Sequence, residues 1–384
     1  MVEDWQHGGF GVYVHWPFCQ SKCPYCDFNS HISTNIDQKR WFRAFLSEIE
    51  RAATPLSGRL LGSIYFGGGT PSLMEPWLVG GIVEALKQKF IFANDVEITL
   101  EANPTSVEAG RFRAYHEAGV NRISMGIQAL NDADLRRLGR LHSVSEAQTA
   151  FETARNIFDR VSFDLIYARQ DQSLDQWRQE LQQALSMAVD HLSLYQLTIE
   201  PGTAFGDRFA KGGLAGLPSE DLGADMYELT QVLCESAGMP AYETSNHAAA
   251  GSESRHNLVY WSSGDYLGIG PGAHGRLTID GKRHSTETYL TPGKWLEAVE
   301  NSNNGQRVSR VLDPFEAQEE SLMMGLRLRT GIDEKRFFSV LVTKKKEIEG
   351  LKNIEMLESV NGFLRTTPQG RPVLNAILRE LLAG

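Results

Sequence analysis

The sequence predicts an α/β fold, a partial (β/α)6 TIM-like barrel followed by a small C-terminal α+β region that resembles a winged helix at its end. Two observations lead to this prediction. From Gly11 to about Asn246, short β-rich runs alternate with loops and with amphipathic stretches of helical spacing. The residues with unusual chemistry come directly after the β-rich runs, at the strand ends where such folds bind their ligands.

Six β-rich runs are the predicted strands. They cover residues 11–15, 62–66, 96–100, 122–126, 161–166 and 191–197. Between the first two, Trp41, Phe45 and Ile49 follow an i, i+4, i+8 pattern that gives a helix one apolar face to lay on the sheet. Six strands are fewer than the eight that close a standard barrel, so an open or partial barrel is expected, with a doubly wound sheet as the alternative.

The chain is expected to divide into three regions: a barrel in residues 1–246, a connecting region in 247–312 and a winged-helix-like domain in 313–384. The strand–helix alternation stops after Asn246, where a stretch rich in Gly, Ser and His begins. Asp313 before Pro314 is typical of a helix start. The run 362–370 is expected to form a hairpin before the last helix.

Charge and hydropathy exclude several classes of protein. The 38 Lys and Arg residues against 48 Asp and Glu give a net charge of -10, which argues against a nucleic-acid partner. No signal-peptide pattern and no uninterrupted run of 18 apolar residues occur, so a cytoplasmic protein without a spanning segment is expected. Peripheral membrane association and a homodimer are left open.

Three of the four cysteines lie within eight residues, in the pattern Cys19-x3-Cys23-x2-Cys26. Such a group is typical of metal binding in a reducing compartment. Three thiolates can hold three irons of a 4Fe-4S cluster and leave the fourth iron to an exogenous ligand. Zinc is the alternative, although structural zinc takes four protein ligands and only His15 and His31 stand near. Cys234 is isolated in the sequence, and an isolated cysteine is usually a small buried apolar residue rather than a ligand.

The run YVHWPFCQSKCPYCDF, from Tyr13 to Phe28, resembles the signature loop of the radical S-adenosylmethionine superfamily. The resemblance implies that the open iron is chelated by the amino and carboxylate groups of S-adenosylmethionine. It also implies that an electron from the cluster cleaves the sulfonium bond to give a 5'-deoxyadenosyl radical. The family positions that contact this ligand match Tyr13, Tyr25, Gln128, Arg140 and Asp164.

Two further motifs suit S-adenosylmethionine. In the run Gly67-Gly68-Gly69-Thr70-Pro71, the backbone at Gly68, Gly69 and Thr70 can approach a ligand closely, although a strand-ending turn could have the same sequence. Glu101, after the third predicted strand, could accept hydrogen bonds from ribose hydroxyls or from the ammonium group. Its alternative is to cap the next helix.

Over nearly its whole length the chain resembles the branch of the superfamily that contains oxygen-independent coproporphyrinogen III dehydrogenase and the HemW family of heme chaperones. The dehydrogenase has a longer segment before its cysteine loop and a fourth cysteine where this chain has Phe28, and both differences favour the chaperones. The run from His256 to Trp261 matches the HNxxYW motif, which the resemblance links to heme binding. A neutral imidazole suits heme iron, and Tyr260 and Trp261 offer flat apolar surface. A histidine bonded to backbone would have the same sequence.

The expected function is therefore that of a heme chaperone, which binds heme and passes it to an acceptor hemoprotein while carrying a 4Fe-4S cluster and S-adenosylmethionine. The alternative is an enzyme that oxidatively decarboxylates coproporphyrinogen III. A redox or structural iron-sulfur protein is a third class. The sequence leaves open whether the chain is an enzyme at all, and the chaperone is favoured.

Overall fold

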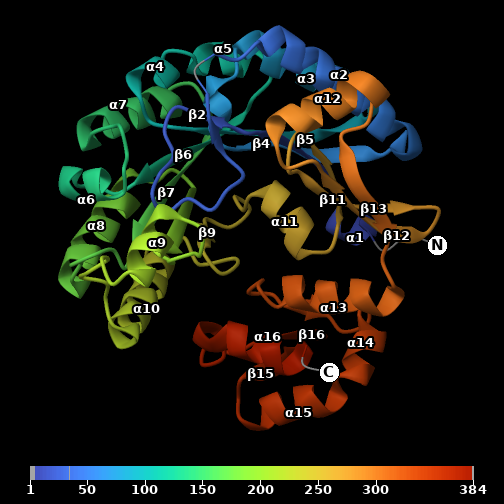
Figure 1. The fold of residues 1–384 in the computed structure, drawn as a ribbon. Helices are drawn as coiled ribbons and strands as arrows, with labels where there is room; N and C mark the ends of the chain where they lie inside the picture. The colour runs from blue at the N-terminus through green and yellow to red at the C-terminus, as the bar shows by residue number, and fades with distance from the viewer. Residues whose placement is uncertain (1–4, 34, 383–384) are drawn as a thin grey trace.

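The predicted strands form the centre of one sheet in the computed structural model, which describes residues 5–33 and 35–382 (Figure 1). The residues outside it are 1–4 and 34, in the first predicted region, and 383–384, in the third. All six central strands run parallel, in chain order, each hydrogen-bonded to the next. They are β1 (Phe10–Trp16), β4 (Leu60–Gly68), β5 (Ile91–Ala102), β6 (Arg122–Gln128), β7 (Arg160–Tyr167) and β8 (His191–Gln196). This confirms the partial-barrel prediction.

The sheet extends beyond these six strands. On one side β10 (Asp265–Ile269) pairs parallel to β1, and the antiparallel strands β11 (His274–Ile279), β12 (Lys282–Thr288) and β13 (Gln306–Val311) follow it. On the other side β9 (Asn246–Ala248) pairs antiparallel to β8. Within the described residues β13 and β9 are the two free edges of this sheet, so the barrel stays open. Residues after 246 thus share a sheet with the barrel, and the division at 246 and 312 remains a proposal.

Helices cover the outer face of the sheet (Figure 1). The longer ones have apolar faces, as in α2, where Trp41, Phe45 and Ile49 are buried. The covering helices include α2 (Gln38–Ala53), α3 (Pro76–Lys89), α5 (Phe112–Glu117), α7 (Val144–Arg155), α8 (Leu174–Met187), α10 (Glu220–Ser236) and α12 (Pro292–Ser302). Shorter elements are α1 (Trp5–Gly8), α4 (Ser106–Ala109), α6 (Asp132–Arg137), α9 (Ala204–Ala210), η1 (Thr54–Leu56) and η2 (Pro71–Leu73).

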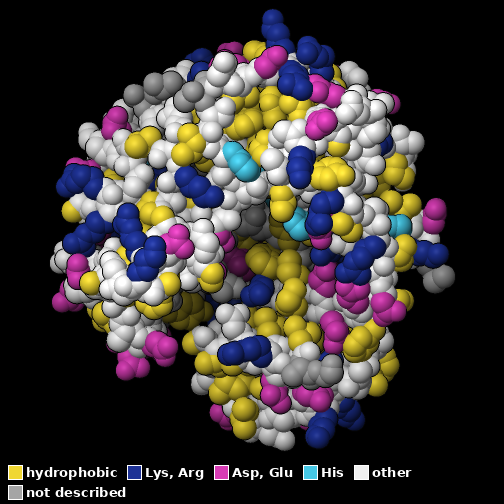
Figure 2. Space-filling model, in the orientation of Figure 1, with side chains coloured by type: hydrophobic (Ala, Val, Ile, Leu, Met, Phe, Trp, Pro, Cys, Tyr) yellow, Lys and Arg dark blue, Asp and Glu magenta, His cyan; other side chains and the backbone are white. Residues whose placement is uncertain are grey.

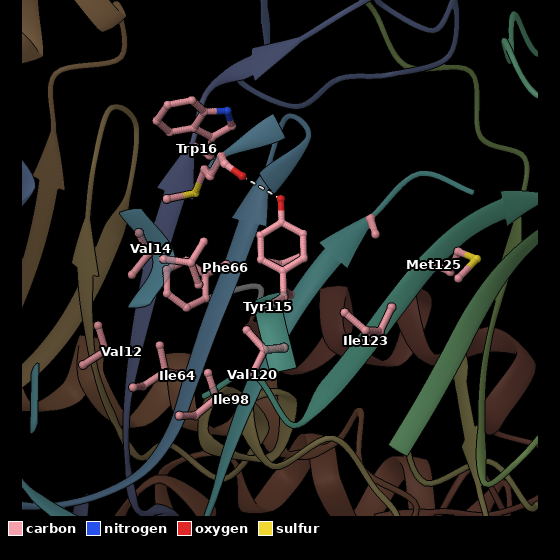
Figure 3. Close-up of a cluster of buried hydrophobic side chains, with 14 of the residues drawn as sticks. Val12, Val14, Trp16, Ile64, Phe66, Ile98, Tyr115, Val120, Ile123 and Met125 are labelled. Carbon is pink, nitrogen blue, oxygen red and sulfur yellow. Dashed lines mark hydrogen bonds between the residues drawn. The ribbon is translucent and has the colours of Figure 1, made fainter. Parts of the chain in front are cut away.

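Strand alternation separates an apolar outer face from a polar interior. Val12, Ile64 and Ile98 are paired across β1, β4 and β5, and they lie side by side in the buried cluster of Figure 3. Burying each such side chain contributes about 1.5–3 kcal/mol. Because successive residues of a strand point to opposite faces, their neighbours line the interior. Those interior residues are mostly polar and include Ser63, Tyr65, Glu97, Thr99, Glu101, Arg122, Ser124, Ser162, Asp164, His191 and Ser193.

The C-terminal residues have a hydrophobic core of their own, formed by side chains from Leu322 to Leu381. Asp313 caps α13 (Pro314–Gly325) by accepting from the Phe315 amide. Then come β14 (Ile332–Asp333), α14 (Phe338–Thr343), α15 (Lys345–Asn353), β15 (Leu357–Val360), β16 (Phe363–Thr366), η3 (Arg371–Val373) and α16 (Leu374–Leu382). The hairpin does not span 362–370 as expected. It pairs β15 with β16, and Asn361 and Gly362 between them both take the left-handed conformation of a two-residue turn.

One short helix, α11 (Arg255–Trp261), packs against β1, β4, β10 and α13, so it contacts both the barrel and the C-terminal residues. It carries the HNxxYW motif. A separate observation concerns membranes: among residues 5–33 and 35–382, no helix is long and apolar enough to cross one.

Candidate functional site

A cavity of about 410 Å³ lies at the carboxyl ends of the parallel strands and continues into the barrel interior. The molecule is visibly hollowed near the middle of the face shown in Figure 2. The cavity brings together eleven of the twelve residues that the sequence proposed for the cluster and for S-adenosylmethionine. These are Cys19, Cys23, Tyr25, Cys26, Gly68, Gly69, Thr70, Glu101, Gln128, Arg140 and Asp164.

The cysteine loop is fixed by hydrogen bonds on several sides. β2 (Phe18–Cys19) and β3 (His31–Ile32) form a small parallel sheet that holds the loop at its base. The Thr70 hydroxyl donates to Cys19 Sγ at 3.4 Å, and Arg140 Nη1 donates to Cys23 Sγ at 3.4 Å. Burial raises the pKa of the Cys19 and Cys26 thiols, so displacement of their protons by a bound metal is what would make them thiolates.

The thiols are not arranged around a single point. Within the described part of the chain, no three His, Cys, Asp or Glu side chains are grouped as one metal ion would require. A mononuclear zinc site needs such convergence, whereas in a 4Fe-4S cluster each cysteine binds a different iron. Three cysteine thiols on one loop are the donor set that holds three irons of such a cluster, so the residues present fit it. By contrast, Cys234 is fully buried, and burial raises its pKa to about 12.

The three glycines of the Gly67–Pro71 run are required by the protein itself. A Cβ on Gly67 would lie 2.8 Å from the Tyr13 ring, and one on Gly69 would lie 2.7 Å from the Phe18 carbonyl oxygen. Gly68 has φ +114°, and its Cβ would lie 2.7 Å from the His15 ring. Close packing of neighbouring strands thus explains these glycines, and it also leaves the backbone of Gly68 and Gly69 exposed to the cavity.

Two partly buried carboxyl groups face the cavity. Burial raises the pKa of Glu101 to about 7 and of Asp164 to about 6. The Tyr65 hydroxyl donates to Glu101 Oε1 at 2.8 Å and the Gly68 amide donates to Oε2 at 3.3 Å, and both bonds oppose that rise. Glu101 is therefore held by the barrel interior and does not cap the next helix. Such shifted carboxyl groups in a cavity are typical of functional sites.

Arg140 ties the cysteine loop to the strand ends. Besides Cys23, its Nη2 donates to Asn103 Oδ1 at 2.6 Å and to the Gly126 carbonyl at 2.8 Å. Its Nε is buried and has no hydrogen-bond partner among residues 5–33 and 35–382. Gln128, at the end of β6, has φ +75°, a left-handed conformation that residues other than glycine adopt mainly where the structure enforces it. Both side chains line the cavity.

Tyr13 and the three proposed heme residues, His256, Tyr260 and Trp261, lie elsewhere, whereas Asn257 of the same motif lines the cavity. The Tyr13 hydroxyl bonds to His15 Nδ1, and its ring packs against those of Tyr65 and His256 without lining the cavity. His256, Tyr260 and Trp261 are also absent from the cavity wall. His256 is 1% exposed. Both its ring nitrogens are bonded, Nδ1 at 3.0 Å from Ser63 Oγ and Nε2 at 2.6 Å from Tyr260 Oη.

Sequence reasoning missed several residues of the cavity. Tyr65, Asn103 and Arg122 line it. Their side chains donate hydrogen bonds to Glu101, Thr70 and Ser162, respectively. His191 and Asn257 line its inner end. Asn103, two residues after Glu101, carried the same strand-end signal as the predicted residues. Arg122 lies at the opposite end, at the start of β6, and its signal was a charge at the head of an apolar strand. Nothing in the local sequence distinguished Tyr65 or His191.

Comparison with known proteins gives a consistent result. Residues 13–184 match the model of the radical SAM superfamily. The heme chaperone HemW of Haemophilus influenzae is 43% identical, over 97% of this chain and 97% of its own length. The mouse radical S-adenosyl methionine domain-containing protein 1, mitochondrial, is 40% identical over 97% and 87%. Among solved structures, coproporphyrinogen III oxidase (HemN) from Escherichia coli superposes with a TM-score of 0.82, over 97% and 90% of the two chains, at 20% identity. That last likeness concerns the fold alone.

Proposed function

This chain belongs to the radical S-adenosylmethionine superfamily and, within it, to the family of the heme chaperone HemW, and we propose that it binds heme and transfers it to an acceptor hemoprotein, carrying a 4Fe-4S cluster and S-adenosylmethionine. One observation supports the cofactor part of this proposal most strongly. The three cysteines and the polar residues from four different strand ends line a single cavity.

Cys19, Cys23 and Cys26 are the proposed ligands of the cluster. Bound there, the cluster supplies an electron to S-adenosylmethionine. Thr70 and Arg140 donate hydrogen bonds to two of the three sulfurs, which favours the anionic form of the ligand set. Arg140 also places a positive charge beside the cluster site.

The proposed contacts with S-adenosylmethionine come from the cavity wall around the cysteine loop. The backbone of Gly68, Gly69 and Thr70 is proposed to meet the methionine zwitterion through carbonyl groups, because their amides already donate to Glu101 Oε2 and to the carbonyls of Trp16 and Phe18. Glu101 and Asp164 offer carboxylates to hydroxyl or ammonium donors. We propose further contacts from Tyr25, Gln128 and Arg140, and an indirect contribution from Tyr13, whose ring packs behind the glycine run.

Heme is proposed to bind outside this cavity. At about 410 Å³, the cavity is near the lower end of the roughly 300–1,000 Å³ typical for one small ligand, and the proposed cluster and S-adenosylmethionine would already occupy it. The motif residues His256, Tyr260 and Trp261 stay the proposed heme residues. Burial lowers the pKa of His256 to about 3, which leaves the neutral imidazole that iron requires. Ligation through Nε2 would require the bond to Tyr260 to open.

The test of the chaperone function is transfer. Heme-loaded protein is mixed with an acceptor apo-hemoprotein, and the absorbance of the holo-acceptor is followed after separation. We expect the acceptor to gain heme faster than it does from free heme. An acceptor that gains nothing would contradict the proposal.

The enzymatic alternative has a test of its own. Anaerobic incubation of the cluster-loaded protein with coproporphyrinogen III, S-adenosylmethionine and a reductant should give no protoporphyrinogen. Formation of protoporphyrinogen would contradict the chaperone proposal and would support the decarboxylase instead.

A further inference from the structure

The helix that carries the motif is anchored to the polar interior of the barrel. Glu97, on β5, is 4% exposed, and its Oε1 accepts from the backbone amides of Arg255 at 3.0 Å and His256 at 3.4 Å. Its Oε2 pairs with Arg160 at 3.1 Å. A carboxylate at a helix N-terminus is bound by free amides and by the helix dipole. The first turn of α11 is therefore fixed to the strand that also carries Glu101.

His256 is aimed from this helix at the strands that border the cavity. Its ring stacks on Tyr65, with centroids 5.1 Å apart and planes 20° apart, and on Tyr13 at 6.1 Å. Its Nδ1 bonds to Ser63, two residues before Tyr65 on β4. Gly11 makes room for this arrangement, since a Cβ there would lie 2.7 Å from Ser63 Oγ and 3.1 Å from His256 Nδ1. The His256 ring is thus packed closely on one side of Tyr65.

Tyr65 in turn reaches the cavity. It lines the cavity wall, and its hydroxyl donates to Glu101 at 2.8 Å. The direction of that hydroxyl depends on the ring that His256 supports. A continuous set of contacts therefore runs from α11, through His256 and Tyr65, to Glu101.

We infer that His256 is a positioning residue of the S-adenosylmethionine pocket, which it orders by holding the Tyr65 ring in place. The inference rests on the proposed function, because it takes the cavity to be the site of S-adenosylmethionine. It adds a regulatory consequence. If iron takes His256 Nε2, the imidazole moves and Tyr65 loses its support, so heme and S-adenosylmethionine weaken each other's binding by the same factor.

The protonation of Glu101 reports on the position of Tyr65. The carboxylate accepts hydrogen bonds in its ionised form, so binding of S-adenosylmethionine should strengthen as the pH rises through the Glu101 pKa of about 7. The Tyr65 bond lowers that pKa, and its loss would raise the midpoint. The other titratable or charged groups that influence or face Glu101 are Asp164, which raises its pKa, Arg122, which lowers it, and Tyr13, Tyr195 and Tyr260.

The experiment measures the dissociation constant of S-adenosylmethionine against pH for anaerobically reconstituted full-length protein. The variants are Tyr65→Phe, His256→Ala and their combination. His247→Ala is the matched control, since His247 is equally buried, at 1% exposure, and is not among the residues lining the cavity. We expect Tyr65→Phe and His256→Ala to move the midpoint to higher pH, the double variant to move it no further, and the control to keep the wild-type midpoint.

A milder change guards against misfolding. Ser63→Ala removes only the hydroxyl that holds Nδ1 and should shift the midpoint in the same direction by less. If wild-type protein binds S-adenosylmethionine but His256→Ala and Ser63→Ala keep its midpoint, the positioning role is overturned and the proposed function stands. If wild-type protein binds no S-adenosylmethionine at any pH, the proposed function itself fails.

Discussion

The rim of the barrel and the motif helix α11 differ in how their polar groups are satisfied. At the rim, the glycine backbone and the side chains of Glu101, Asp164 and Arg140 face a cavity, and the Arg140 Nε has no partner within the described protein. In α11, both nitrogens of His256 are bonded to other side chains. A ligand at the rim can use the unpartnered Arg140 Nε and the remaining acceptor capacity of the two carboxyl groups, whereas a ligand at His256 Nε2 must displace the bond to Tyr260. A motif in the sequence indicates which chemistry is present but not whether it is accessible.

The largest effect is expected from the cysteine loop. Replacing Cys19, Cys23 or Cys26 by Ser should abolish the cluster, because two thiolates do not hold a cubane that binds S-adenosylmethionine. Iron and acid-labile sulfide, measured after anaerobic reconstitution, should fall to background. Cys234→Ala, at the remaining cysteine, should keep wild-type content. A Cys26→Ser variant with a full cluster would contradict the ligand set.

Next in size is the effect of Glu101→Gln. Removing a charged hydrogen-bond acceptor should weaken binding of S-adenosylmethionine by about 10- to 100-fold above pH 7. It should also abolish the pH dependence near 7, since glutamine does not ionise. Equilibrium dialysis at several pH values measures both. Glu108→Gln is the control, because that carboxyl is buried but does not line the cavity. A Glu101→Gln variant that binds like wild type would remove Glu101 from the site.

Substitutions in the glycine run can distinguish whether its glycines are needed for close packing of the strands or for ligand binding. Gly69→Ala should lower the free energy of unfolding by about 1–3 kcal/mol, because its Cβ would overlap the Phe18 backbone. Gly62→Ala, on β4, the strand that ends one residue before Gly69, places its Cβ 3.6 Å from the nearest atom and should cost less. Urea unfolding of the two variants makes the comparison. Equal stability would mean that the rim relaxes and that the glycines serve the ligand alone.

A smaller effect concerns the motif helix. Tyr260→Phe removes the hydroxyl that competes for His256 Nε2, so heme affinity should rise by about 2- to 10-fold. Heme titration followed by absorbance measures it, with Tyr266→Phe as the neighbouring control. Unchanged affinity for Tyr260→Phe, together with an unchanged Soret band for His256→Ala, would exclude His256 as the heme ligand.

The sequence predicted the rim well because its signals are local. A parallel strand is recognised from its residue pattern, and the residue after it lies at the ligand edge whatever the rest of the chain does, as Glu101 and Gln128 show. The position of His256 depends on contacts distant in sequence: Gly11 and Ser63 make room for its ring, and Glu97 holds its helix. The extension of the sheet by β10 to β13 was missed for a similar reason, since pairing of β10 with β1 joins residues more than 250 positions apart.

The central claim is that the three clustered cysteines leave one iron of a cubane open to S-adenosylmethionine. Electron paramagnetic resonance of the anaerobically reconstituted and reduced protein, recorded before and after addition of S-adenosylmethionine, tests this most directly. The account predicts a 4Fe-4S signal that changes when the ligand binds to the open iron. A signal that ignores the ligand, or a preparation that contains zinc instead of iron, would contradict it.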